Sequence, residues 1–335
     1  MARGGLAQSV HNRLLENNIK ASGFIVDDKY YTDGMYLCDL PVLSFSQVVN
    51  KGKFNLVMGV GNYALGYKKQ KEFAQICNVF CIVDIPYRNN IITNEMLEAN
   101  IDMYENAANI FEDRQSVECM VAWINCCLSD RAEYCFPMYH GQQTYFNNDV
   151  FNISEKEVFL DIGAYTGDTI RQFYGASKNR FSFIYAIEGD KDNFSCLQKT
   201  VRELKIENKV NVYNEICKDK MENILFTTDY KEKEGYIVYT SSDGTIKSIT
   251  LDILLKIRKK ITLLKINFPE ALSVLKGAEA IIKADKPKLT IMVGWGGKMV
   301  AEIPSYIKTI VPEYKIYLRY ISAMPTRIMM IAACE

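Results

Sequence analysis

The chain has 335 residues, of which 48% are apolar, and its 40 basic side chains are balanced by 40 acidic ones. The length predicts two folded units, and the balanced charge argues against a dedicated nucleic-acid-binding protein, which normally carries a basic surplus. No apolar run reaches the roughly 18 residues of a membrane-spanning helix, and the segment MARGGLAQSVHNRLLENN lacks a signal peptide's apolar stretch, so we expect a soluble, cytoplasmic protein without a transmembrane segment.

Residues 1–90 alternate helices with short apolar strands, a pattern typical of an α/β fold with a parallel sheet. The spacing predicts helices at 8–17 and 67–77 and strands at 23–27, 54–60 and 79–84. No strand is expected before Gly4-Gly5, where a nucleotide-binding unit would have one ahead of its glycine turn. We therefore interpret residues 1–90 as a small, incomplete Rossmann-like module.

Residues 92–128 carry apolar side chains at helical spacing. These side chains are Met96, Ile101, Tyr104, Ala108, Phe111, Val117, Met120, Val121 and Ile124. Pro137, Gly141 and the polar run at 147–149 then mark a break, which predicts a domain boundary near residue 150. We expect a helical connector over 91–150 and a second domain over 151–335.

The second domain shows stronger α/β alternation. Strands are predicted at 157–162, 183–188, 209–213, 261–266, 288–293, 314–319 and 327–332, and helices at 169–174, 192–204, 271–284 and 301–310. Residues 224–250 read as an inserted hairpin with its turn near 242–244. Two final strands without a long intervening helix predict a seven-stranded doubly wound sheet, Rossmann-like, closed by an antiparallel edge strand. This is the topology of class I methyltransferases.

The cysteines and histidines predict no metal site. The ten cysteines are scattered without a CxxC pair, and the chain has only two histidines. A zinc site or a disulfide framework would impose regular spacings. We therefore interpret the cysteines as reduced thiols that pack as small apolar side chains.

The clearest local motif is VFLDIGAYTGDTI at 158–170, an apolar strand that ends in Asp161 and is followed by a turn between Gly163 and Gly167. Glycine suits a turn that must approach a ligand closely, and Asp168 can begin the next helix. The spacing is not GxGxxG, which disfavours a pyrophosphate cofactor. Acidic residues around the turn suit a ligand with an amino group, such as the amino-acid end of S-adenosylmethionine.

A second motif, YAIEGD at 185–190, places Glu188 at the end of the next strand. A carboxylate there can accept hydrogen bonds from both ribose hydroxyls of an adenosine cofactor. Alone this is a weak signal, because a glutamate at a strand end is often only solvated. Together with the glycine turn it favours an adenosine-containing ligand.

The second half of the chain resembles the FkbM-type S-adenosylmethionine-dependent methyltransferases. The matching segments, in the family's order, are 143–170, 184–194, 240–255, 274–291 and 302–322. The N-terminal module also resembles versions of this family from bacterial surface-polysaccharide gene clusters. The resemblance implies that the methionine end of the cofactor is lined by Asp161, Gly163, Ala164, Gly167 and Asp168, with Glu188 on the ribose.

The chain departs from the family at two positions. Where the family usually has Lys-Ile-Asp-Val-Glu-Gly, this chain reads KINFPE at 265–270, so Asn267 replaces a carboxylate and Glu270 is the candidate substitute base. Where the family usually has Tyr-His, this chain has Gly294 and Trp295. We expect Asn267 and Trp295 at the substrate end, with Tyr165 and Glu270 as candidate catalytic side chains.

Two functions follow from the resemblance and its departures. The first is an O-methyltransferase that acts on a sugar hydroxyl of a polysaccharide or its precursor. The second is a protein with the methyltransferase fold that has lost catalysis and serves as a binding or assembly subunit in glycan synthesis. They differ in whether the protein must bind S-adenosylmethionine. A third reading, an NAD-dependent enzyme, is disfavoured by the glycine spacing.

Overall fold

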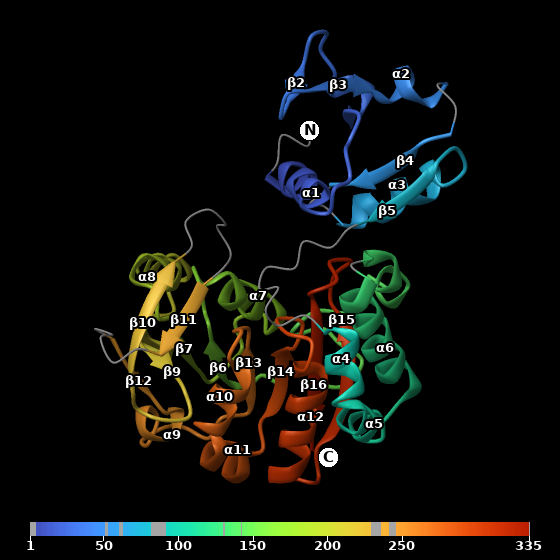
Figure 1. Cartoon of the computed structure of the whole chain (residues 1–335). Helices are drawn as coiled ribbons and strands as arrows, with labels where there is room; N and C mark the ends of the chain where they lie inside the picture. The colour runs from blue at the N-terminus through green and yellow to red at the C-terminus, as the bar shows by residue number, and fades with distance from the viewer. Residues whose placement is uncertain are drawn as a thin grey trace.

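The computed structural model describes residues 5–50, 53–59, 63–81, 92–129, 131–141, 143–228, 236–240 and 246–334. Figure 1 shows a small N-terminal module, coloured blue, next to a larger domain built on a long twisted sheet. Within these ranges, no helix combines the length and the apolar character needed to cross a membrane.

The N-terminal module contains α1 (Gly5–Glu16), β1 (Phe24–Val26), β2 (Tyr36–Leu37), β3 (Leu40–Ser44), α2 (Phe45–Val49), β4 (Asn55–Met58), α3 (Tyr63–Phe73) and β5 (Asn78–Cys81). Its described strands form two sheets, β1-β3-β2 and β4-β5, so the expectation of one parallel sheet is wrong. The cause is a short hairpin that the apolar pattern did not reveal: β2 and β3 pair antiparallel, and β3 takes the place beside β1. Of the strand expected at 79–84, the part after Cys81 lies outside the described residues.

The large sheet contains β6 (Val158–Ile162), β7 (Phe183–Ile187), β8 (Val210–Tyr213), β13 (Leu263–Ile266), β14 (Lys288–Met292), β15 (Lys315–Tyr320) and β16 (Ile328–Ala333). The strand order β15-β16-β14-β13-β6-β7-β8 confirms the predicted seven-stranded doubly wound sheet. The antiparallel strand, however, is not at the edge: β16 lies between β14 and β15 and is antiparallel to both. A connection as short as 321–327 only allows β16 to return beside β15 as a hairpin.

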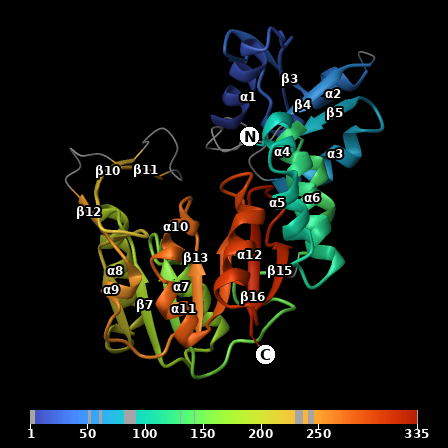
Figure 2. The same ribbon diagram turned by 60° about the horizontal axis from the view of Figure 1, so that its bottom comes forward.

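Helices cover both faces of this sheet (Figures 1 and 2). They are α7 (Asp168–Ala176), α8 (Lys191–Leu204), α10 (Ala271–Lys276), α11 (Glu279–Asp285) and α12 (Met299–Ile310). Alternate residues of β6 reach opposite cores: Phe159 packs in the cluster of α7 and α8, and Leu160 packs in the cluster of α10, α11 and α12. The single helix expected at 271–284 is two helices, which break at Gly277 where a Cβ would lie 2.1 Å from the Lys218 carbonyl oxygen.

Between β8 and β13 the chain forms a small separate sheet. Its elements are β9 (Ile216–Cys217), β10 (Asn223–Thr228), β11 (Tyr236–Thr240) and β12 (Ile246–Ile249), followed by α9 (Leu251–Leu254). The predicted hairpin is confirmed, since β10 and β11 pair antiparallel. These two strands are joined through 229–235, so the turn expected at 242–244, which lies outside the described residues, does not connect them.

The connector contains α4 (Asn94–Glu98), α5 (Ile101–Ala108) and α6 (Arg114–Ser129), as its helical spacing predicted. It packs against the large sheet domain: α5 contacts α12, and α6 contacts β15. Arg319 of β15, only 2% exposed, bonds to the carboxylates of Asp113 and Asp149 at 2.6 and 2.9 Å. The described part of the connector thus shares one hydrophobic core with the sheet.

Candidate functional site

A cavity of about 450 Å³ lies at the C-terminal ends of the central strands β6, β7 and β13. Ile162, Ile187 and Asn267, which stand at or directly after the ends of these strands, all line it. The chain leaves β6 towards β7 on one side and continues from β13 towards β14 on the other, so the strand order reverses here. Open α/β sheets bind their ligands at such a reversal.

The glycine turn between β6 and α7 forms one wall of this cavity. Gly163 has φ +70° and its Cβ would lie 2.8 Å from the Asn267 carbonyl oxygen, while Gly167 has φ +86° and its Cβ would lie 2.8 Å from the Thr200 side chain. Both positions therefore require glycine. Of the predicted turn residues, Gly163 and Tyr165 line the cavity.

Of the other three predicted residues of this turn, only Asp168 lines the cavity. Asp168 opens α7. Ala164 and Gly167 are not among the described residues that line it, and Ala164 is completely buried. Both residues therefore belong to the turn without lining the cavity.

Glu188 joins the glycine turn to the next strand. Its Oε2 accepts a hydrogen bond from the Tyr165 backbone N–H at 2.8 Å, and its Oε1 accepts one from the Asp190 N–H at 2.9 Å. Burial raises the pKa of this carboxyl, and the two N–H donors oppose that rise. The side chain lines the cavity, so the predicted pairing of glycine turn and acidic strand end is present at one site.

Asp161 is not placed as the resemblance implied. It is completely buried and is not among the described residues that line the cavity. Its Oδ1 accepts a hydrogen bond from Lys265 Nζ at 2.8 Å, and the same ammonium donates to the Gly163 carbonyl at 2.9 Å. Burial alone would lower the pKa of Lys265, but the Asp161 carboxylate raises it. Asp161 thus holds Lys265, and Lys265 holds the turn.

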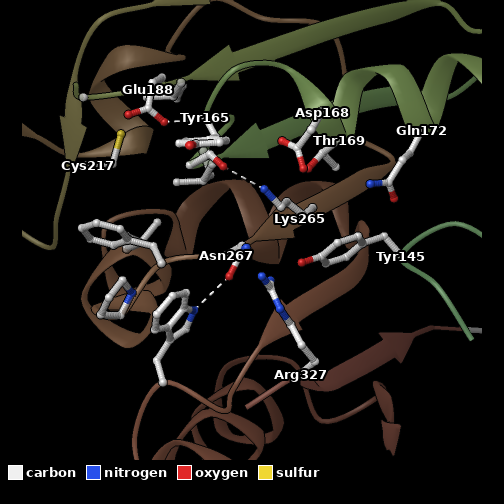
Figure 3. Close-up of a pocket in the computed structure, with 18 of the residues that line it drawn as sticks. Tyr145, Tyr165, Asp168, Thr169, Gln172, Glu188, Cys217, Lys265, Asn267 and Arg327 are labelled. Carbon is white, nitrogen blue, oxygen red and sulfur yellow. Dashed lines mark hydrogen bonds between the residues drawn. The ribbon is translucent and has the colours of Figure 1, made fainter. Parts of the chain in front are cut away.

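Asn267 and Trp295, the two departures from the family pattern, contact each other. The indole Nε1–H of Trp295 donates to Asn267 Oδ1 at 2.9 Å, and both side chains line the cavity (Figure 3). Because an indole can only donate, this bond fixes the amide with its oxygen towards Trp295. The Asn267 NH₂ group therefore remains as a donor.

The loop that carries Trp295 is held on both sides. A Cβ on Gly294 would lie 2.0 Å from the Thr326 carbonyl oxygen, so the loop packs directly against the segment before β16. A Cβ on Gly297 would lie 2.2 Å from the Ile92 side chain, and the Tyr104 hydroxyl donates to the Gly297 carbonyl at 3.3 Å. The connector therefore positions this wall of the cavity.

Glu270, the candidate substitute base, is wrongly placed for that role. It is not among the described residues that line the cavity. It precedes α10, and its carboxylate lies 3.2 Å from Lys218 Nζ. The Glu270 carboxylate is therefore directed to an ion pair with Lys218 rather than to the cavity.

Sequence reasoning missed several residues that line the cavity. Figure 3 shows Lys265 at its centre, with Tyr145, Thr169, Gln172, Cys217 and Arg327 around it. A sequence signal for Lys265 existed: it lies inside the apolar run ITLLKI at 261–266, and a buried lysine needs an acidic partner. The structure shows that this partner is Asp161 on the adjacent strand. Arg327 reaches the site because β16 is antiparallel, so its beginning lies where the parallel strands end.

Comparison with known proteins shows the fold. The chain is similar to the crystal structure of methyltransferase FkbM from Methylobacillus flagellatus KT, with a TM-score of 0.70 and 20% sequence identity over 94% of this chain and 84% of that chain. The fold is therefore that of a class I methyltransferase, as predicted. No protein-family model matches the chain, and no curated protein matches it.

Two other solved structures align over about half of the chain. An rRNA methylase from Streptococcus thermophilus has a TM-score of 0.36 and 12% identity over 55% of this chain and 89% of that one. TrmK from M. capricolum, in complex with S-adenosyl-homocysteine, has a TM-score of 0.34 and 13% identity over 54% of this chain and 63% of that one.

Proposed function

We propose that this protein is an S-adenosylmethionine-dependent O-methyltransferase that acts on a sugar hydroxyl in polysaccharide synthesis. The observation that carries the proposal is that Glu188 and the glycine turn from Gly163 line one cavity at the point where the strand order reverses. The likeness of fold and the sequence resemblance to FkbM-type enzymes support the same conclusion.

The cavity suits the cofactor in size and charge. Its volume of about 450 Å³ lies within the usual range for small-molecule sites. The charged residues that line it are three carboxylates and two cations, Asp168, Glu188, Glu215, Lys265 and Arg327. The surplus of carboxylates suits a ligand that carries both a sulfonium and an ammonium group.

The chain's own residues have distinct roles in this proposal. Glu188 would accept hydrogen bonds from the ribose hydroxyls, and the Asp168 carboxylate would bind the amino group at the methionine end. The cofactor, when bound, supplies an electrophilic methyl group to an acceptor oxygen. Tyr165 lines the cavity beside Glu188, and Trp295 offers an aromatic surface to the acceptor. These side chains orient the acceptor and exclude water, which accounts for much of the rate in such reactions.

The direct test is binding followed by transfer. We expect calorimetric titration of the full chain to give saturable binding of both S-adenosylmethionine and S-adenosylhomocysteine. Transfer of a radiolabelled methyl group to a panel of free and nucleotide-linked sugars then identifies the acceptor. Absence of heat with both ligands, together with an unchanged melting temperature at a large ligand excess, would contradict the proposal.

The second candidate function is a non-catalytic binding subunit, and the Asn267–Trp295 contact is the observation that favours it. The hydrogen bond of 2.9 Å occupies the amide at the position where the family carries a carboxylate. Such a pair is also what we expect at the substrate end of a protein that no longer catalyses methyl transfer.

Asn267→Asp separates the two readings. Aspartate can still accept the Trp295 N–H, so the fold is retained, but it removes the NH₂ donor and adds a charge. If the site is rebuilt around Asn267, methyl transfer falls; if the asparagine marks decay, transfer rises. The control is Asn208→Asp, an exposed position outside the cavity, which we expect to leave transfer unchanged.

A further inference from the structure

We propose that the acceptor is anionic, and that Arg327 and Tyr145 bind its carboxylate or phosphate group. This inference rests on the proposed methyltransferase function and specifies the acceptor more narrowly than a neutral sugar. It is carried by a set of hydrogen-bond donors that converge on one part of the cavity.

Arg327 presents a charge to the cavity without a partner of its own. Its side chain lines the cavity, and among the described residues no carboxylate lies within ion-pairing distance of its guanidinium. Arg319, eight residues earlier, is the contrast: its guanidinium is paired with Asp113 and Asp149. A guanidinium held in a cavity without a counter-ion is a preformed site for a carboxylate or phosphate.

Tyr145 is the second donor and is independent of the first. The residue is only 7% exposed, and its hydroxyl is buried without a hydrogen-bond partner among the described residues. A buried donor left unpaired is costly, so this hydroxyl is arranged for a ligand acceptor. Burial raises the pKa of Tyr145, which keeps the phenol protonated and able to donate.

Asn267 supplies the third donor. Its oxygen is occupied by the Trp295 N–H at 2.9 Å, so its NH₂ group is what it can offer to a ligand. Figure 3 shows Asn267, Arg327 and the Tyr145 hydroxyl gathered in one part of the cavity. All three groups donate, and their complement is an oxygen group that only accepts, which a neutral sugar hydroxyl is not.

The placement of this cluster assigns it to the acceptor. Figure 3 shows Glu188, Tyr165 and Asp168 on one side of Lys265 and Arg327 on the other. Glu188 follows β7, Tyr165 belongs to the glycine turn and Asp168 begins α7. We place the cofactor beside these three residues. Arg327 lies directly before β16, on the far side of β13 and β14.

The test titrates anions into protein saturated with S-adenosylhomocysteine and follows Trp295 fluorescence in a Trp123→Phe background. The probes are D-glucuronate, inorganic phosphate and, as the neutral counterpart, D-glucose. We expect D-glucuronate to bind at least about tenfold more tightly than D-glucose, and Arg327→Gln to remove that preference. Tyr145→Phe should weaken anion binding by a smaller factor. The control is Arg202→Gln, an exposed arginine outside the cavity.

The outcomes separate this inference from the proposed function. If neither anion binds more tightly than D-glucose, or if Arg327→Gln leaves the preference intact, the inference is overturned. If Arg327→Gln instead weakens S-adenosylhomocysteine by about tenfold or more, the arginine holds the cofactor's own carboxylate and the inference also fails. Failure of S-adenosylhomocysteine to bind the unaltered protein refutes the proposed function itself. Melting temperatures establish that each variant is folded.

Discussion

Glu188→Gln tests the candidate cofactor site with the smallest change of shape. In the structure each carboxylate oxygen of Glu188 accepts one backbone N–H, from Tyr165 at 2.8 Å and from Asp190 at 2.9 Å. A glutamine keeps one acceptor oxygen and replaces the other with an NH₂ group, so one of these N–H groups faces a second donor. The same change removes an acceptor for the ribose hydroxyls.

The size of the effect follows from these bonds. Loss of one hydrogen bond to a charged acceptor costs about 1.5–3 kcal/mol, which corresponds to a roughly 10- to 150-fold weaker affinity for S-adenosylhomocysteine. Calorimetric titration measures it, and the matched control is Glu207→Gln, an exposed residue outside the cavity. Equal affinities of Glu188→Gln and the unaltered protein, with both folded, would refute the assignment of Glu188 to the cofactor.

The pH dependence of binding gives a second readout of the same residue. Burial raises the pKa of Glu188 above 4.5, and only the ionised form can accept all of its hydrogen bonds. We therefore expect affinity for S-adenosylhomocysteine to fall as the pH falls towards this raised pKa. Glu188→Gln should lose that part of the pH dependence, and an unchanged pH profile would contradict the reasoning.

Two further predictions concern stability, measured by chemical denaturation. Gly294→Ala would place a Cβ 2.0 Å from the Thr326 carbonyl oxygen and should destabilise the protein by about 1–3 kcal/mol. The control is Gly175→Ala, which has no atom within 4 Å of its Cβ and should be neutral or slightly stabilising. Equal effects of the two substitutions on stability would count against the close approach at Gly294. Arg319→Met should cost about 2–3 kcal/mol, because it leaves carboxylates of the connector unpaired. Burial alone would raise the pKa of Asp113, but Arg319 holds it below 3.8, so its contribution is present above that pH and is lost as the pH falls further. A variant whose acid sensitivity matches that of the unaltered protein would exclude this ion pair as the cause.

The order of strands and helices in the large domain could be predicted because buried parallel strands leave strong apolar runs. The position of β16 could not, since periodicity identifies a strand but not its neighbours. The hairpin of β2 and β3 was missed for a related reason: β2 has only two residues and no buried side chain. Gly277 shows a third limit, because the contact with Lys218 that accompanies the helix break is distant in sequence.

The candidate site divides along similar lines. The glycine turn and Glu188 could be found because their chemistry lies in contiguous motifs. Tyr145 and Arg327 could not, since each reaches the cavity only through tertiary packing. Glu270 was expected to line the cavity because it is close in sequence to Asn267. Its ion pair with Lys218 directs its carboxylate away from the cavity. The geometry thus separates residues that are close in the chain.

The contacts between the connector and the Trp295 loop have a consequence for how the chain can be divided. A fragment that begins at residue 151 would lack Ile92 and Tyr104, which hold Gly297, and Asp113, which neutralises Arg319. Such a fragment would keep the glycine turn. It would lose the contacts that support the cavity wall carrying Trp295, and it would expose the apolar faces of β15 and α12. A unit that retains the complete cavity therefore needs the chain from Ile92 onwards. In a chimaera, the connector must therefore travel with the sheet.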